Sequence, residues 1–168
     1  MNRLLAFYDG SHPDDRGRFL ADILRQDDLW LEQTHDYIQW LFPLYEPSRV
    51  LPSAPLIDPE VAAAFHADDL LQSRLRGSWL RMLAFYGLAC RNGAVVKGPH
   101  WAERKSNWFT EGTHNDLRIT RILKSLCALG LRSEAQALLA CLEALRSSEA
   151  DCGIDETAYR YWRSAVPD

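Results

Sequence analysis

Signals for helix starts and ends recur along this chain, whereas strand signals are scarce. Asp58-Pro59 combines a capping residue with a proline at the first helical position. Gly130 follows the amphipathic stretch 115–129 and is a typical helix stop. Residues 94–98 are the one β-like stretch, and we expect them to be too short to build a sheet. The sequence therefore predicts an all-α fold, a compact bundle of about seven helices.

The spacing of apolar residues places the predicted helices. Apolar side chains recur three and four positions apart in most of the chain, which is the period of one helix face. Proline, glycine and capping residues then set the boundaries. The helices are expected over residues 14–26, 28–44, 58–67, 68–90, 99–109, 115–129 and 133–152, with a last one that follows Asp155.

A proline-rich segment interrupts this pattern between the second and third predicted helices. Residues 45–57 contain three prolines, which exclude both a helix interior and a central strand. Loops of this length are usually functional or wrapped on a core. We therefore expect an ordered loop that lies across the helices around it.

Length and composition favour one globular domain over residues 1–168. Hydrophobic residues make up 47% of the chain and charged residues 25%, which is ordinary globular usage. The four cysteines form no Cys-x-x-Cys pair, which favours a reduced, cytoplasmic setting. No apolar run is long enough for a transmembrane segment.

The charge balance argues against a nucleic-acid partner. The formal net charge is −4, so the chain as a whole does not attract phosphate backbones. Cations and aromatic residues do mix locally, a combination that can bind nucleic acid. These residues are Lys97, Trp101, Arg104, Lys105 and Trp108, and we expect a solvated face there.

Three segments resemble a known family. They are HDYIQWLFP at residues 35–43 with its flanks, RMLAFYG at 81–87, and HNDLRITRILKSL at 114–126. The chain resembles the conserved region of the opioid growth factor receptor family, in a short single-domain form, over roughly residues 7–165. In the animal members this region binds the pentapeptide Met-enkephalin. The resemblance thus implies a helical, receptor-like module for a peptide.

Polar side chains form a stripe on each of two signature helices. An acidic stripe with a histidine and a basic stripe with a histidine each fall within about 60° at helical spacing. Their members are Asp28, Glu32, His35 and Gln39 on one helix, and His114, Arg118, Arg121 and Ser125 on the other. If the stripes pair with each other, their role is structural; if they line a cleft, the arginines suit a carboxylate or phosphate.

The leading functional hypothesis is a binding module for a peptide or small anionic ligand, without a cofactor. Tyr37 and Trp40 are expected to form apolar walls. The predicted ligand-binding residues are His35, Tyr37, Gln39, Trp40, His114, Arg118 and Arg121.

Three alternatives remain open. An enzyme of unknown class would use His35 and His114 as acid and base, since histidine titrates near neutrality, although the sequence has no nucleophile motif. A structural protein would form a homodimer through an exposed aromatic patch. A metal site would use the Glu-x-x-His pairs 32–35 and 111–114, as in di-iron bundles.

Overall fold

The computed structural model describes residues 1–168 and is mostly helical. It has a small two-stranded sheet, so the prediction of a purely all-α bundle of about seven helices was right in class and wrong in detail. The helices are α1 (Arg3–Tyr8), α2 (Leu20–Leu24), α3 (Asp28–Gln33), α4 (Ile38–Leu41), α5 (Pro59–Ala67), α6 (Asp69–Phe85), α7 (Trp101–Arg104), the 3-10 helix η1 (Lys105–Asn107), α8 (Asn115–Ala128), α9 (Arg132–Ser148) and α10 (Glu156–Ala165).

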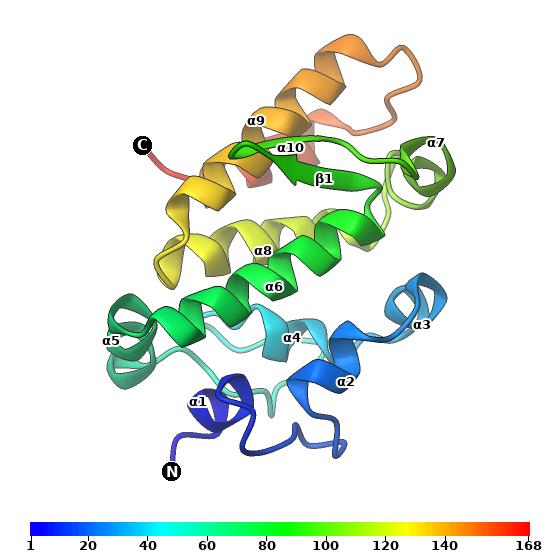
Figure 1. The fold of residues 1–168 in the computed structure, drawn as a ribbon. Coiled ribbons are helices and arrows are strands. Elements are labelled where there is room, and N and C mark those ends of the chain that lie inside the picture. Colours follow the sequence, from blue (N-terminus) through cyan, green and yellow to red (C-terminus); the bar gives the residue numbers. More distant parts are fainter.

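Helix α6 crosses the middle of the molecule. In Figure 1 the short N-terminal helices α1 and α2 lie below it, and α9, α10 and the sheet lie above it. One hydrophobic cluster of 42 buried residues joins these parts. Its largest fully buried side chains are four tryptophans, namely Trp40, Trp79, Trp108 and Trp162. Helix α8 packs against both α9 and α10, so one of its faces is committed to the core.

A β-hairpin replaces the predicted end of the helix over residues 68–90. Helix α6 ends at Phe85, and Gly87 then turns the chain with a φ of +79°. Strand β1 (Leu88–Arg91) pairs antiparallel with β2 (Ala94–Lys97). The intervening Asn92-Gly93 turn has positive φ at both residues, which suits the twist of a two-residue hairpin. The prediction that residues 94–98 are too short to build a sheet was therefore wrong, because the partner strand β1 had been predicted as part of a helix.

The helix predicted over residues 28–44 is broken into α3 and α4. Thr34 is extended, with φ −102° and ψ 132°. The carbonyls at the end of α3 find side-chain donors in place of further helical N–H groups. The Tyr37 hydroxyl donates to the Leu31 carbonyl at 2.8 Å, and Arg118 donates to the carbonyls of Leu31 and Thr34 at 2.9 and 2.8 Å. These contacts end the helix.

Two other predicted helices are shorter than expected. Within residues 14–26 only α2 is helical, because the Asp14 carboxylate accepts the backbone N–H groups of Arg16 and Arg18 and holds a turn. Such local side-chain bonds compete with a helix. Within residues 99–109 the chain forms only α7 and η1.

Several boundaries were predicted correctly. Asp58 caps α5 by accepting the Val61 N–H at 2.8 Å, and Asp155 caps α10 by accepting the Ala158 N–H at 2.7 Å. Helix α8 ends one residue before the predicted Leu129. Helix α9 begins at Arg132, one residue before the predicted start at 133, and no side chain caps it.

The segment 45–57 is a loop, as predicted, with no helix or strand. Its ends are tied together, because the Ile57 N–H donates to the Leu44 carbonyl at 2.8 Å. Inside it, the Ser48 hydroxyl accepts the N–H groups of Val50 and Leu51, both at 3.2 Å. These bonds hold residues 48–50 in a defined position.

Candidate functional site

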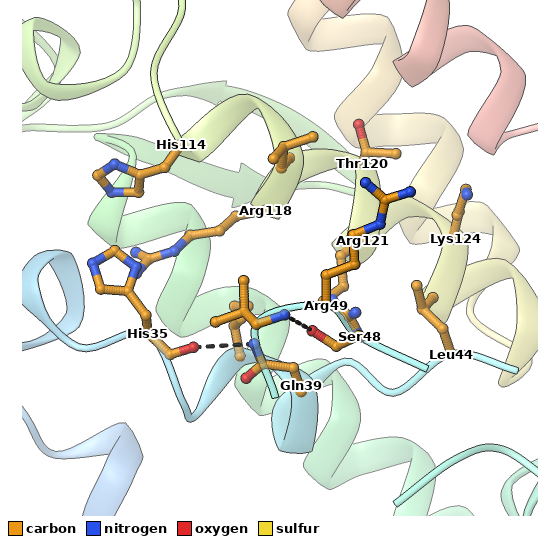
Figure 2. Close-up of a pocket in the computed structure, with 13 residues that line it drawn as sticks. His35, Gln39, Leu44, Ser48, Arg49, His114, Arg118, Thr120, Arg121 and Lys124 are labelled. Atoms are coloured by element: carbon orange, nitrogen blue, oxygen red, sulfur yellow. Dashed lines mark hydrogen bonds between the residues drawn. The ribbon is translucent and has the colours of Figure 1, made fainter. Parts of the chain in front are cut away.

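A cleft lies between α4, the loop 45–57 and α8. Its volume is about 310 Å³. Figure 2 shows His35 and His114 at one end of it, with Arg121 and Lys124 at the other. It is lined by His35, Ile38, Gln39, Leu44, Ser48, Arg49, Val50, His114, Leu117, Arg118, Thr120, Arg121 and Lys124. Five of the seven predicted site residues are thus brought together: His35, Gln39, His114, Arg118 and Arg121.

Tyr37 and Trp40 do not line the cleft, so their predicted role as apolar walls was wrong. The break between α3 and α4 turns both side chains into the core. Tyr37 is fully buried, and its ring lies 5.5 Å from the Arg118 guanidinium. Trp40 is buried with its ring centroid 5.1 Å from that of Phe7. Tyr37 therefore contacts the cleft-lining Arg118 from the core, and Trp40 is a core residue.

Other residues supply the apolar walls. Ile38 and Leu44 lie towards the core side, on α4 and at the start of the loop. Val50 on the loop and Leu117 on α8 are 68% and 74% exposed. Exposed aliphatic side chains on two facing elements give the mouth of the cleft an apolar surface.

The charged lining is entirely basic. Arg49, Arg118, Arg121 and Lys124 line the cleft, and no aspartate or glutamate does. Among these four cations only Lys124 has an ion pair, with Glu46 at 3.6 Å. Sequence reasoning missed Lys124 and Arg49. Lys124 lies three residues after Arg121 on the same helix, so helical spacing could have found it; the loop position of Arg49 gave no signal.

Arg118 is buried and holds α3 in place. It is 5% exposed, and its guanidinium donates hydrogen bonds to the carbonyls of Leu31 and Thr34. A cation at a helix C-terminus also interacts favourably with the helix dipole. Arg118 is therefore a positioning residue for this end of the cleft.

Arg121 keeps most of its hydrogen-bonding capacity free. One N–H donates to the Phe42 carbonyl at 3.1 Å, and no carboxylate pairs with the guanidinium. Burial lowers the pKa of Arg121 from its ordinary value, and the distant Glu46 carboxylate offsets this only in part. An arginine remains charged regardless. A half-buried positive charge without a counter-charge is favourable to an incoming anion.

The two histidines form a pair at the other end. Their ring centroids are 5.1 Å apart, and His114 Nε2 lies 2.9 Å from the Glu32 carboxylate. Burial lowers the pKa of His35, with Arg118 and His114 adding to the effect. The Arg118 guanidinium lies 3.4 Å from His35 Nδ1, and because a guanidinium can only donate, Nδ1 is the acceptor in this contact.

The two polar stripes meet only in part. Glu32 contacts His114 and also accepts from the Asn115 amide at 3.2 Å. Asp28 instead pairs with Arg81 at 3.0 Å and Arg104 at 3.5 Å, away from the basic stripe. Two further members, Gln39 and Ser125, bury oxygens without hydrogen-bond partners. The basic stripe is therefore left largely without carboxylates.

Three further sequence hypotheses concern a metal site, a nucleic-acid surface and a transmembrane segment. No group of three or more His, Cys, Asp or Glu side chains is arranged to hold a metal ion. Trp101 and Trp108 are buried, and Lys97 and Lys105 are paired with Glu149 and Asp151, so this segment is not an exposed stacking surface. No helix has the length and apolar character needed to cross a membrane.

These features define a mostly helical domain with a basic cleft, and comparison with known proteins places it in a family. The family described as "Opioid growth factor receptor (OGFr) conserved region" matches residues 5–167. The chain therefore belongs to the opioid growth factor receptor family.

Curated relatives agree with this assignment. The chain is 38% identical to the human opioid growth factor receptor over 158 residues, which cover 89% of this chain and 23% of that protein. It is 35% identical to the mouse opioid growth factor receptor-like protein 1 over 135 residues, covering 77% of this chain and 29% of the relative. The chain thus spans about a quarter of the length of these relatives. No solved structure matches it.

Proposed function

We propose that this chain is a receptor-like binding module whose cleft holds the anionic group of a peptide or small ligand. The observation that carries the proposal is a lining with four cations and no carboxylate, in which only Lys124 is paired. Clefts lined by one sign of charge attract ligands of the opposite sign.

Arg121 is the central contact in this proposal. Its planar guanidinium presents several N–H groups and suits two-point binding of a carboxylate or phosphate. Its one internal bond, to the Phe42 carbonyl, fixes its direction. Ile38, Leu44, Val50 and Leu117 would contact the apolar part of the ligand.

The relatives support a receptor-like role with a peptide partner. Their names describe an opioid growth factor receptor and a receptor-like protein. A peptide carries a C-terminal carboxylate and apolar side chains, both of which match the lining. A small anionic ligand with an apolar group matches the same lining.

A thermal-shift screen tests the proposal. Enkephalin-like peptides and anionic metabolites are added to the wild-type chain and to Arg121→Ala. A ligand at 100 times its Kd raises the wild-type stability by about 2.7 kcal/mol, and Arg121→Ala should lose this gain. Arg91→Ala is the matched control, because Arg91 is exposed on β1 outside the cleft. If no compound shifts the wild-type melting temperature, the proposal is wrong.

A second candidate function, acid–base catalysis, is favoured by one observation. The Glu32 carboxylate lies 2.9 Å from His114 Nε2, and His35 stands beside it in the same cleft. A carboxylate that orients a histidine is a common arrangement in acid–base catalysis. A ligand from the screen would then be chemically altered after incubation, and mass spectrometry would detect the product. Recovery of unchanged ligand would contradict this alternative.

A further inference from the structure

We infer that the anionic group bound in the cleft is a dianionic phosphomonoester, held between Arg49, Arg121 and Lys124. This inference rests on the proposed function and goes further, because it names the class of ligand. It applies to the end of the cleft away from the two histidines, where these three cations lie.

The net charge at this end of the cleft favours a dianion. Arg49, Arg121 and Lys124 contribute three positive charges, and the one carboxylate in contact with them, Glu46, contributes one negative charge. The difference is a net charge of +2. A phosphomonoester carries about −1.5 to −2 at pH 7, whereas a carboxylate carries one negative charge. The dianion matches the site, and a carboxylate leaves one cation unpaired.

The hydrogen-bonding groups agree with this count. Arg121 donates one N–H to the Phe42 carbonyl, and Arg49 makes no side-chain hydrogen bond within the chain. The Ser48 oxygen already accepts two backbone N–H groups, so its hydroxyl proton is free to donate. This end therefore offers many donors, and the three terminal oxygens of a phosphate ester are strong acceptors.

The apolar residues indicate what the phosphate is attached to. Val50 and Leu117 flank the mouth from the loop and from α8, and both are mostly exposed. A volume of about 310 Å³ lies at the small end of ligand sites and fits one phosphorylated group with an attached ring or short apolar chain. The source is either a free phosphomonoester or a phosphorylated side chain of a peptide, and the two share this chemistry.

Two probes of equal shape and different charge test the inference. Phenyl phosphate is a dianion at pH 8, and phenyl sulfate is its monoanionic counterpart. Isothermal titration at low salt should give phenyl phosphate about tenfold tighter binding than phenyl sulfate, because the additional charge meets cations in a partly buried site. Inorganic phosphate should bind more weakly than phenyl phosphate, because it lacks the group that contacts Val50 and Leu117.

Variants locate the binding. Arg121→Gln should abolish phenyl phosphate binding. Arg49→Gln changes an exposed loop residue with no side-chain bond, so it should fold normally and remove most of the preference for phosphate over sulfate. Arg91→Gln, on β1, should bind like the wild type. A peptide containing phosphotyrosine is titrated in parallel, and tighter binding than phenyl phosphate identifies the phosphorylated side chain as the source.

The outcomes separate this inference from the function it rests on. If phenyl phosphate and phenyl sulfate bind with equal affinity and Arg121→Gln loses both, the preference for a dianion is refuted. The proposed anion-binding function then still stands. Phosphate binding that survives both Arg121→Gln and Arg49→Gln overturns the assignment to this cleft. If the wild type binds none of these probes but binds a carboxylate peptide from the thermal-shift screen, the inference of a phosphomonoester ligand is again refuted. If it binds no anion at all, both proposals fall.

Discussion

Replacement of Arg118 by methionine should destabilise the protein strongly, whether or not a ligand is present. The side chain is 5% exposed and donates to the carbonyls of Leu31 and Thr34 at 2.9 and 2.8 Å. Hydrogen bonds to a charged group contribute about 1.5–3 kcal/mol each, so the loss of two costs about 3–6 kcal/mol. Domains have a total stability of about 5–15 kcal/mol, so this is a large fraction of the whole.

Urea unfolding followed by tryptophan fluorescence measures the effect. With an m-value of about 2 kcal/mol per molar, the midpoint should fall by roughly 2 M. Arg118→Lys should be intermediate, because one ammonium keeps the charge and contacts one of the two carbonyls. Arg91→Met controls for the loss of an exposed arginine. A loss below about 1 kcal/mol in Arg118→Met would refute the view that this guanidinium ends α3, since a surface substitution alone costs that little.

Two further predictions concern residues outside the cleft. The pKa of Asp116 is raised to about 6, mainly by burial and to a smaller extent by the negative charge of Asp155. The folded chain therefore keeps a proton that the unfolded chain releases near pH 4, and the contribution of Asp116 to stability falls as the pH rises from about 4 to 6. Asp116→Asn should be more stable at pH 7.5 and flatten this fall in urea unfolding; an unchanged pH profile would contradict the prediction. Gly87→Ala should lower the melting temperature by at least about 3 °C, since strain of this kind costs about 1–3 kcal/mol. Its Cβ would also lie 2.9 Å from Trp101 Cα. Gly93→Ala has the same φ with open space, so equal losses in both variants would rule out the contact as a cause.

Local signals in the sequence predicted the helix starts that a neighbouring side chain caps. Asp58 and Asp155 cap the helices that follow them, because the bonds they make span three residues. The break near Thr34 could not be predicted in this way. Its donor, Arg118, lies 84 residues further along the chain, and no periodicity in residues 28–44 reports it. Tertiary contacts of this kind override local propensity.

The same break decided which of the predicted site residues line the cleft. Tyr37 was placed beside the ligand on the assumption of a continuous helix, and the break turns it into the core. Arg121 lies on α8, where the helix was predicted correctly, and it lines the cleft as expected. His35 also reaches the cleft, although the helix that was expected to carry it ends before it.

The two walls of the cleft differ in structure, because one is a helix and the other is the loop 45–57. One wall belongs to α8, whose other face is part of the core, while the opposite wall is a segment tied down at Leu44 and Ile57. If the cleft binds a ligand as proposed, substitution of a buried lining residue on α8 such as Arg118 should disturb folding and recognition together. Substitutions at Arg49 and Val50 should then change recognition alone, since both side chains are exposed. Under the proposed function, selectivity would therefore diverge through this short stretch of loop while the same helical scaffold is retained.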